Sequence, residues 1–561
     1  MKIRKISRLA FTFALVASVS FVSCSKKGAE LSSGGLLESA MLAKVPPSSM
    51  FFSIMNMTSS AFSSFKASEW GYNPSELLEK ADKLADQAGQ GGKTFVNAIK
   101  ATGFIRTSKD AEETISEMVL FGAFDDATKL PMAGAYFSAA SGKELKSSVQ
   151  RVSKSLKESG VPVKDDTISG NPAIEISTAP PGAAPGMPFG AIYFAASDST
   201  AAISTNKAVI ERAFSDAKDG LSKLSLSPEF GKVKSLLPSA SQQLSVSYVA
   251  IKEIAAKASE FLPPMGEGAP DLKTIPVDAV LVSGRMSDTP SYLIAALTTA
   301  KTPSQDKIIS NLGGGNAADP LVQAPAESSF VLGFDGALLA GIKAAALEKA
   351  PPTQQEMLKE QLKPLDGLKS LGIGVVGAAG ASPFPGILIS LNTANGEALE
   401  QAIKSNLSGA VASSGMPVSD WQDKTVEGTP VKYIQSPMVG LGVYMAKSGT
   451  GLVLGSSDDV IKLAILAAKA KSSALAASLS EDSQRLISET KSVLTAYGNF
   501  NRIADAIESV QGSLAAFTGG QNMVSADQTA NLRKVGIMLS SVYFDSGILK
   551  IETTYSKAKT K

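Results

Sequence analysis

The sequence predicts an α+β protein built from two tandem homologous units, each a mostly antiparallel sheet with helices packed on one face. Three observations lead to this prediction. Blocks of sequence recur in the same order, strand-like and helix-like hydrophobic periods alternate, and hairpin signals outnumber possible parallel crossovers. Two large copies behind a short N-terminal segment therefore account for most of the 561 residues.

The recurrence consists of five blocks displaced by about 250 to 280 residues. Their shared order is hard to explain by composition alone, so we expect a tandem duplication. The paired blocks are residues 45–52 with 324–331, 143–163 with 397–418, 167–172 with 425–430, 193–210 with 444–461, and a helix near Ile251 plus strands over 277–299 with Ile503 and 535–555.

This repeat also predicts the domain boundaries. The first unit should cover residues 38–302 and the second residues 320–556, with a linker over 303–319 and a polar tail over 557–561.

Within each unit, short β-rich runs bounded by turn residues predict strands, and Asp545-Ser546-Gly547 predicts a hairpin turn. Helix starts are predicted at Asn73, which precedes a proline, and at Ser457, which precedes two aspartates. Strands are expected at 191–195, 279–283, 387–391 and 540–554, and loops at 179–188, at 262–270 and at the counterpart of the latter, 512–531.

The absence of histidine and the presence of one cysteine exclude several kinds of site. Without His there is no Ser-His-Asp or Cys-His catalysis, and there are no imidazole metal ligands. One Cys excludes intrachain disulfides and cysteine-held clusters. We expect no cofactor and a binding or structural role.

The first residues have the anatomy of a secretory signal. Four basic residues precede an apolar run over residues 9–22, which is too short to span a bilayer comfortably. Cys24, the only cysteine, follows Phe21-Val22-Ser23, which resembles the lipobox of bacterial lipoproteins. This resemblance implies a signal peptide over residues 1–23, a diacylglyceryl group on the Cys24 thiol, and an acyl chain such as palmitate on the new amine.

Lipidation would tie the protein to a membrane through the tether over residues 24–37. By resemblance to enterobacterial sorting, Ser25 favours the outer membrane, with the folded units facing the periplasm. Cleavage removes four positive charges and no negative ones, so the net charge of +2 becomes −2. No basic surface for nucleic acid is therefore expected.

Several weak structural motifs occur together in this chain. They include the proline before an apolar strand at 45–52, the helix ending at Gly160, the turn at Gly170 and the helix opening at Ser457. Together they resemble an uncharacterised, often duplicated, domain-of-unknown-function family of exported bacterial proteins over residues 38–556. The resemblance implies an architecture and neither a reaction nor site residues.

Three short motifs are candidates for chemistry. The glycine pattern at residues 372–377 matches a dinucleotide fingerprint by letters, but turn residues follow it, so a glycine-rich strand beside a close neighbour is expected. A histidine-free serine hydrolase remains an alternative, since Ser63 with Lys66, Ser204 with Asn206, and Lys447 with Ser448 follow the order of penicillin-binding enzymes.

Adjacent acids occur at residues 125–126, 165–166 and 458–459. They could be acid/base pairs or calcium ligands, but they are more often turn or cap residues in water. The strand aromatics should mostly be core, and some could line an apolar groove.

Three functions follow from the sequence. The first is a lipid-anchored envelope protein that binds another envelope component, protein or glycan, without catalysis. The second is a periplasmic carrier of lipid or another hydrophobic ligand. The third is the serine–lysine hydrolase, which requires that Ser63 react with β-lactam or fluorophosphonate probes.

Overall fold

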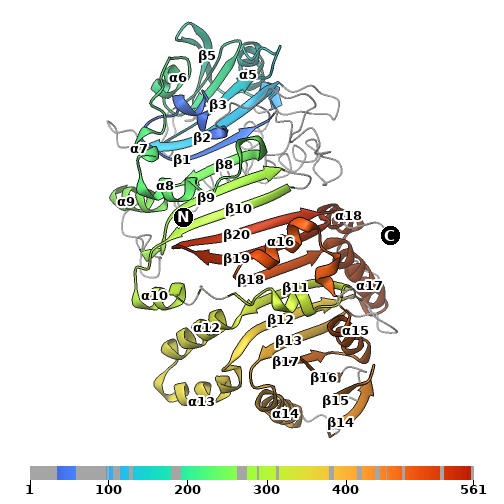
Figure 1. The fold of residues 1–561 in the computed structure, drawn as a ribbon. Helices are drawn as coiled ribbons and strands as arrows, with labels where there is room; N and C mark the ends of the chain where they lie inside the picture. The colour runs from blue at the N-terminus through green and yellow to red at the C-terminus, as the bar shows by residue number, and fades with distance from the viewer. Residues whose placement is uncertain are drawn as a thin grey trace. The chain divides into compact units, whose positions relative to one another are not determined.

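The computed structural model describes residues 35–57, 97, 100–104, 114–124, 131–177, 191–261, 274–286, 290–310, 312, 315–377, 385–413, 420–435, 442–449, 451–470, 474–518 and 524–557 (Figure 1). The chain divides into two compact units. One comprises Met1–Lys273 with Val277–Pro290, and the other comprises Thr274–Pro276 with Ser291–Lys561. Among the described residues, no helix is both long and apolar enough to cross a membrane.

The first unit is an antiparallel sheet in the order β4-β5-β6-β7-β3-β2-β1-β8-β9. Its strands are β1 (Ser49–Asn56), β2 (Ile115–Phe124), β3 (Pro131–Ala139), β4 (Val163–Ile168), β5 (Asn171–Ser177), β6 (Ala191–Ala196), β7 (Thr200–Ser204), β8 (Gln243–Val249) and β9 (Val277–Met286). Its helices are η1 (Leu36–Glu38), η2 (Leu42–Lys44), α5 (Ser147–Glu158), α6 (Lys207–Ala213), α7 (Ser222–Ser225), α8 (Pro228–Lys234), η4 (Ala240–Gln242) and α9 (Ile251–Phe261).

The second unit is an antiparallel sheet in the order β14-β15-β16-β17-β13-β12-β11-β18-β19-β20-β10. Its strands are β10 (Pro290–Thr298), β11 (Ser328–Asp335), β12 (Leu368–Val376), β13 (Gly386–Thr393), β14 (Gln422–Val426), β15 (Thr429–Gln435), β16 (Gly442–Ser448), β17 (Gly451–Gly455), β18 (Ser492–Asn499), β19 (Ile537–Asp545) and β20 (Ile548–Ser556). Its helices are α10 (Pro303–Ser310), α11 (Asp319–Gln323), α12 (Gly336–Lys349), α13 (Pro352–Leu362), η7 (Lys363–Leu365), α14 (Gly396–Ser413), α15 (Asp458–Lys469), η9 (Leu475–Ser478), α16 (Glu481–Glu489), α17 (Phe500–Thr518) and α18 (Ala526–Val535).

The α+β class with mostly antiparallel sheet is confirmed, but the prediction of helices on one face is wrong. In the second unit, α15 packs Val460 against a core that includes Leu388 of β13, whereas α14 packs Leu399 against Leu391 of the same strand. Residues three apart on a strand point to opposite faces. The two helices therefore cover opposite faces of the sheet.

The first unit has the same arrangement. The hydroxyl of Tyr136 on β3 donates a hydrogen bond to the Val209 carbonyl of α6, at 2.8 Å. The neighbouring Phe137 packs against a separate hydrophobic cluster, which includes Val152 of α5. Because consecutive residues of a strand alternate faces, α5 and α6 also lie on opposite sides of their sheet.

Most local predictions on described residues are confirmed. Ser457 caps α15 by accepting a hydrogen bond from Val460 N. The hairpin of β19 and β20 turns at Ser546 and Gly547, whose φ angles of 53° and 82° suit a tight two-residue turn. The helix start at Asn73 and the loops at 179–188 and 262–270 fall on residues outside the described part.

The loop expected over residues 512–531 is corrected by the structure. Helix α17 continues to Thr518, and α18 begins at Ala526, so most of this stretch is helical. One glycine at residue 512 does not end a helix of this length. Ser525 and Gln528 form a capping box that starts the second helix soon afterwards.

The first compact unit ends at Pro290. The reason is that β10 pairs with β20 over residues 291–297, which assigns it to the second unit.

Candidate functional site

Across the middle of β11, β12 and β13, one face of the second unit's sheet carries apolar side chains. Each β12 residue of this set is directly opposite one residue of β11 and one of β13. Directly opposed residues of antiparallel strands point to the same face. We call this set the open apolar face, and its members are Phe330, Leu332, Ile373, Val375, Ile387 and Ile389.

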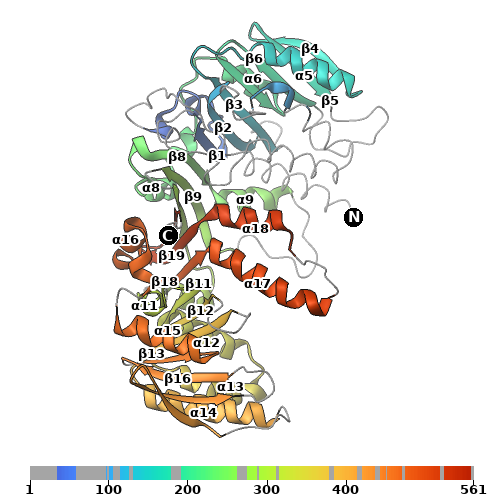
Figure 2. The ribbon, with the colours of Figure 1, turned by 90° about the vertical axis from the view of Figure 1, so that its right-hand side faces the viewer.

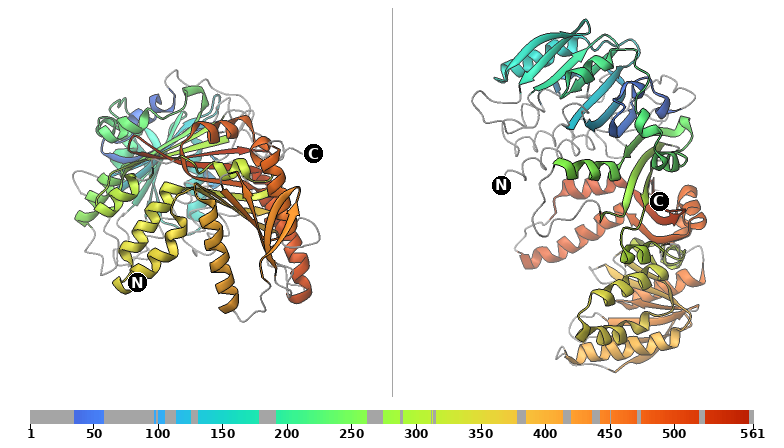
Figure 3. Two further views of the ribbon diagram at one scale, coloured as in Figure 1. Left: turned by 60° about the horizontal axis from the view of Figure 1, so that its bottom comes forward. Right: turned by 90° about the vertical axis from the view of Figure 1, so that its left-hand side faces the viewer.

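The exposure of this face is uneven. Ile373 and Ile387 are 38% and 52% exposed, and the other members are half-buried. The same face continues to Leu391, which is only 8% exposed because Leu399 of α14 and Leu339 of α12 pack in its cluster. In the left view of Figure 3, α12, α13 (yellow) and α14 (gold) extend from the same side of this sheet. Helical cover thus stops short of Ile373 and Ile387.

The opposite face of the same strands is closely packed. A Cβ built on Gly372 would lie 2.3 Å from the Pro320 Cβ of α11, and one on Gly333 would lie 2.0 Å from the Ala317 carbonyl oxygen. Only glycine allows this approach. The glycine pattern at 372–377 is therefore a strand beside a close neighbour over the described part, as predicted.

Helix α12 adds further exposed apolar surface. Its residues are apolar around most of the helix, and such helices are usually buried on all sides. Ile342 is nevertheless 55% exposed, as is Met357 of α13, and Leu365 of η7 is 41% exposed. The second unit thus exposes large apolar side chains on its helices as well as on its sheet.

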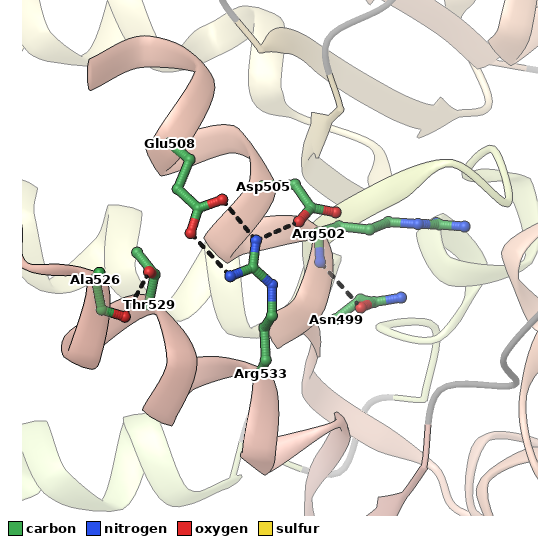
Figure 4. A network of polar contacts seen from close by, with 7 residues as sticks. All are labelled: Asn499, Arg502, Asp505, Glu508, Ala526, Thr529 and Arg533. Carbon is green, nitrogen blue, oxygen red and sulfur yellow. Dashed lines mark hydrogen bonds and ion pairs between the residues drawn. The ribbon is translucent and has the colours of Figure 1, made fainter. Parts of the chain in front are cut away.

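A polar network joins α17 and α18, which lie side by side (Figure 2). The Arg533 guanidinium donates to both carboxylate oxygens of Glu508, at 2.8 and 2.7 Å, and to Asp505 at 2.7 Å (Figure 4). The bonds from Arg533, and then one from Thr529, lower the pKa of Glu508 to about 2. Both carboxylates of the network are already bonded to Arg533. We therefore interpret the network as a contact that holds the two helices together.

The environment of Glu117 on β2 opposes the charge of its carboxylate. Burial raises its pKa above the usual value, and a hydrogen bond from the Ser39 hydroxyl only partly offsets this effect. Perturbed acids are candidates for functional groups. Its one hydroxyl partner offers no arrangement for proton transfer to a substrate, so we assign it no catalytic role.

Replacing Glu117 with glutamine should stabilise the protein at pH 7. A carboxyl whose pKa is raised by folding binds its proton more tightly when folded, so its charge destabilises the fold at high pH. The gain should be full well above the folded pKa and should disappear as the pH falls below about 4.5, the usual glutamate value. Thermal unfolding of both proteins from pH 4 to pH 8 measures this, and equal melting temperatures at pH 7 would contradict it.

Some residues of the serine hydrolase motifs lie in the described part of the chain. There they hold turns and helix ends together. The buried Ser204 hydroxyl donates to the Ala133 carbonyl at 2.9 Å and accepts from Asn206 N at 3.2 Å. Asn206 itself caps α6 by accepting from Ala208 N at 2.9 Å. Ser204 is thus held as part of a turn.

The other residues of the serine hydrolase motifs give no support to a hydrolase. Lys447 belongs to the second unit and forms an ion pair with Glu397 at 3.6 Å, with both side chains largely exposed. Ser63 and Lys66 lie outside the described residues, as does Cys24.

The acid pairs that are described form surface ion pairs. Asp165 pairs with Lys157 at 2.8 Å and Asp166 with Lys207 at 2.9 Å, and hydrogen bonds from these lysines lower the pKa of both carboxyls. Asp458 pairs with Lys424. The pair at 125–126 lies outside the described part. Within the described ranges, no three acidic or cysteine side chains gather as a metal site would require.

Sequence reasoning missed the open apolar face. It did predict that the strand aromatics are mostly core. This is confirmed for Phe52, Phe194 and Tyr444, at 0%, 2% and 5% exposure, but Phe51 is 36% exposed and Tyr193, Tyr543 and Phe544 are only half-buried. The available signal for the face was the aliphatic residues at alternate positions of β12 and β13. That pattern equally fits a strand whose aliphatic face is fully buried.

The chain matches no family model, and no curated protein matches it. Two solved structures do match it in part. Crystal form III of TP0453 has a TM-score of 0.24 and 8% identity, over 47% of this chain and 82% of that chain. Crystal form I of TP0453 has a TM-score of 0.21 and 11% identity, over 49% of this chain and 84% of that chain. At TM-scores this low, the likeness carries no argument about fold or function.

Proposed function

We propose that this protein is a lipid-anchored lipoprotein of the bacterial cell envelope that binds another envelope component without catalysis. The observation that carries the proposal is the position of the only cysteine, Cys24, directly after a signal-like apolar run. Its lipid chains would hold the protein at the outer membrane, with the folded units facing the periplasm. Its partner would be an envelope protein, a glycan or a lipid.

We also infer that the two units are duplicated copies of one domain. Their strand orders correspond strand for strand, from β4 matching β14 to β9 matching β19. The register of β1 on β2 shifts between Ser49 and Phe51, and that of β11 on β12 shifts at the corresponding Ser328 and Phe330. Such irregularities are kept within families and support common descent.

Two ion pairs, one in each unit, support the duplication in a different way. Lys207 begins α6 and pairs with Asp166 in β4, while Asp458 begins α15 and pairs with Lys424 in β14. These are corresponding positions with the signs of the charges exchanged. The second arrangement has the acid at the helix N-terminus, which the helix dipole favours.

This exchange predicts a charge-swap result in the first unit. Asp166→Lys alone should lower the melting temperature, because it places two lysines together. Adding Lys207→Asp should restore it fully, because it reproduces the second unit's arrangement and places an acid at the N-terminus of α6. Thermal unfolding of the two single variants and the double variant tests this. A double variant as unstable as Asp166→Lys would show that the two positions are not equivalent.

A second function, the carrier of a hydrophobic ligand, is favoured by the open apolar face. Soluble proteins rarely leave aliphatic side chains such as Ile373 and Ile387 adjacent and exposed without a partner. Mass spectrometry of organic extracts from the purified protein separates the two functions. Stoichiometric lipid beyond the covalent anchor supports the carrier, whereas its absence together with a cross-linked envelope protein or glycan supports the binding protein.

A further inference from the structure

We propose that residues 35–45 form a strap that opens and closes on the first unit independently of its sheet, and that the hydrogen bond between Ser39 and Glu117 controls how often it opens. The strap joins the segment that carries Cys24 to the first strand, β1. Opening would therefore lengthen the free chain between the lipid anchor and the sheet. That consequence rests on the anchor proposed above, whereas the opening itself does not.

The strap is a separate piece of backbone. It contains η1 and η2, and the amides of residues 38, 39, 43, 44 and 45 donate to carbonyls of the strap itself. Among the described residues, those of the strap belong to no strand. Pro46 and Pro47, which follow it, have no N–H group to donate. The strap can therefore leave the unit without breaking the hydrogen bonds of the sheet.

Side chains close the strap on the unit. Gln243, the first residue of β8, accepts a hydrogen bond from Leu36 N at 3.1 Å, and the Ser39 hydroxyl donates to Glu117 on β2. Four apolar side chains of the strap are at most 5% exposed, namely Leu36, Met41, Leu42 and Val45. Because this burial removes them from water, the closed form is the stable one.

The backbone that receives the other end of the strap is strained. Gly220 N donates to the Ala43 carbonyl at 2.7 Å, and a Cβ built on Gly220 would lie 2.3 Å from the Leu42 carbonyl oxygen. Leu221 follows with φ 55° and is only 6% exposed. A residue with a Cβ rarely adopts this conformation unless its surroundings hold it there. Opening the strap would let this turn relax.

Glu117 opposes the closed form, while Ser39 favours it. Burial raises the pKa of the Glu117 carboxyl, and the hydrogen bond from Ser39 only partly offsets this effect. The residues directly opposite Glu117, Asn56 on β1 and Ser138 on β3, carry no charge. The closed strap thus buries a carboxylate with little compensation, so the loss of one hydroxyl partner should shift the equilibrium.

The second unit fixes the segment before its first strand more firmly. There Asp335 accepts three N–H donors from that segment, and Asn316 of the segment forms a bridge to Ser492 on β18. From the strand pairings, Asn56 takes the place of Asp335 in the first unit, and the acid is Glu117, directly opposite Asn56. The unit that follows the anchor therefore has the segment that opens.

Opening about doubles the reach of the anchored protein. Residues 24–34 span at most about 40 Å when fully extended, at about 3.6 Å per residue. Adding residues 35–45 raises this limit to about 80 Å. The strap thus sets how far the first unit can move from the membrane.

Thiol labelling of single-cysteine variants tests the proposal. All proteins are the full chain with Cys24→Ala, which removes the only native cysteine. Met41→Cys places a thiol on the strap, and Met118→Cys places one in the core on β2, where the native side chains are 5% and 9% exposed. Absorbance during reaction with dithiobis-nitrobenzoate gives both rates. The strap thiol should react at least about tenfold faster, because local opening costs less than unfolding of the unit.

Three further variants locate the opening. Ser39→Ala should speed the labelling of Met41→Cys by about tenfold or more, because it removes a hydrogen bond to a charged group. Glu117→Gln keeps an acceptor for Ser39 without a buried charge and should slow it. Val152→Ala makes a cavity in the core beneath α5, which is present in the closed and open forms alike. It should speed the labelling of Met118→Cys and leave that of Met41→Cys within about twofold.

Three results would overturn the proposal. If Val152→Ala speeds both probes equally, the strap opens only when the whole unit unfolds. If Ser39→Ala leaves the rate of Met41→Cys unchanged, or Glu117→Gln raises that rate, the contact between them does not control the strap. None of these results depends on a lipid at Cys24, because the test proteins lack it. Failure of the lipoprotein assignment would leave the labelling rates as they are and remove only the difference in reach.

Discussion

Replacing Cys24 with alanine is expected to abolish lipid labelling and to release the protein from the membrane fraction. Transfer of acyl chains into a bilayer contributes about 0.8 kcal/mol per methylene, so two or three chains give effectively permanent anchoring. Metabolic labelling with palmitate and fractionation of cell lysates measure the two effects together.

Ser25→Ala is the matched control, because it changes the next residue and leaves the thiol intact. It should remain labelled and membrane-bound. If the Cys24→Ala protein stays with the membranes while carrying no lipid label, the lipoprotein assignment is wrong and another segment or partner holds the protein there.

The elements that could be predicted from the sequence are those set by neighbouring residues. Ser457 precedes two aspartates at the start of α15, and Ser546-Gly547 fills a turn that requires positive φ. In both cases, side-chain and backbone preferences within four residues decide the structure. Such signals do not depend on the rest of the chain.

The distribution of helices over the sheet could not be predicted in the same way. The apolar stripe of α14 or α15 shows that the helix packs against something, but not on which side of the sheet it lies. The strand they share, β13, places a leucine in a core cluster on each face, Leu388 on one and Leu391 on the other. Such a strand is compatible with cover on either side.

The candidate site could not be predicted from the sequence, because the exposure of its side chains depends on where the helices that cover the sheet end. Ile389 and Ile387 are two residues apart on one strand face, yet the first packs against a core cluster and the second is 52% exposed. Nothing in their immediate sequence distinguishes them. The difference arises from helices about ten or more residues away, whose placement is a property of the whole fold.

Asp335 should be among the most sensitive positions of the second unit. It ends β11, is only 1% exposed, and has no cation beside it among its described contacts. One oxygen caps α12 by accepting from Ala337 N at 2.8 Å. The other accepts from Gly315 N, Asn316 N and Asn316 Nδ2 at 3.0, 2.9 and 3.2 Å. The carboxylate thus ties a helix start to the segment before α11.

Asp335→Ala should therefore cost about 3–5 kcal/mol of unfolding free energy, because it removes a helix cap and leaves buried N–H donors unpaired. Asp335→Asn should cost less, since Asn56 occupies the corresponding position in the first unit and an amide oxygen can still cap α12. Asp366→Ala, which removes an exposed acid paired with Lys343, is the control and should change stability by less than about 1 kcal/mol. Denaturant unfolding gives the free energies, and hydrogen exchange at residues 315, 316 and 337 should accelerate only in the Asp335 variants. If Asp335→Ala proves as stable as the control, these hydrogen bonds do not hold the second unit together.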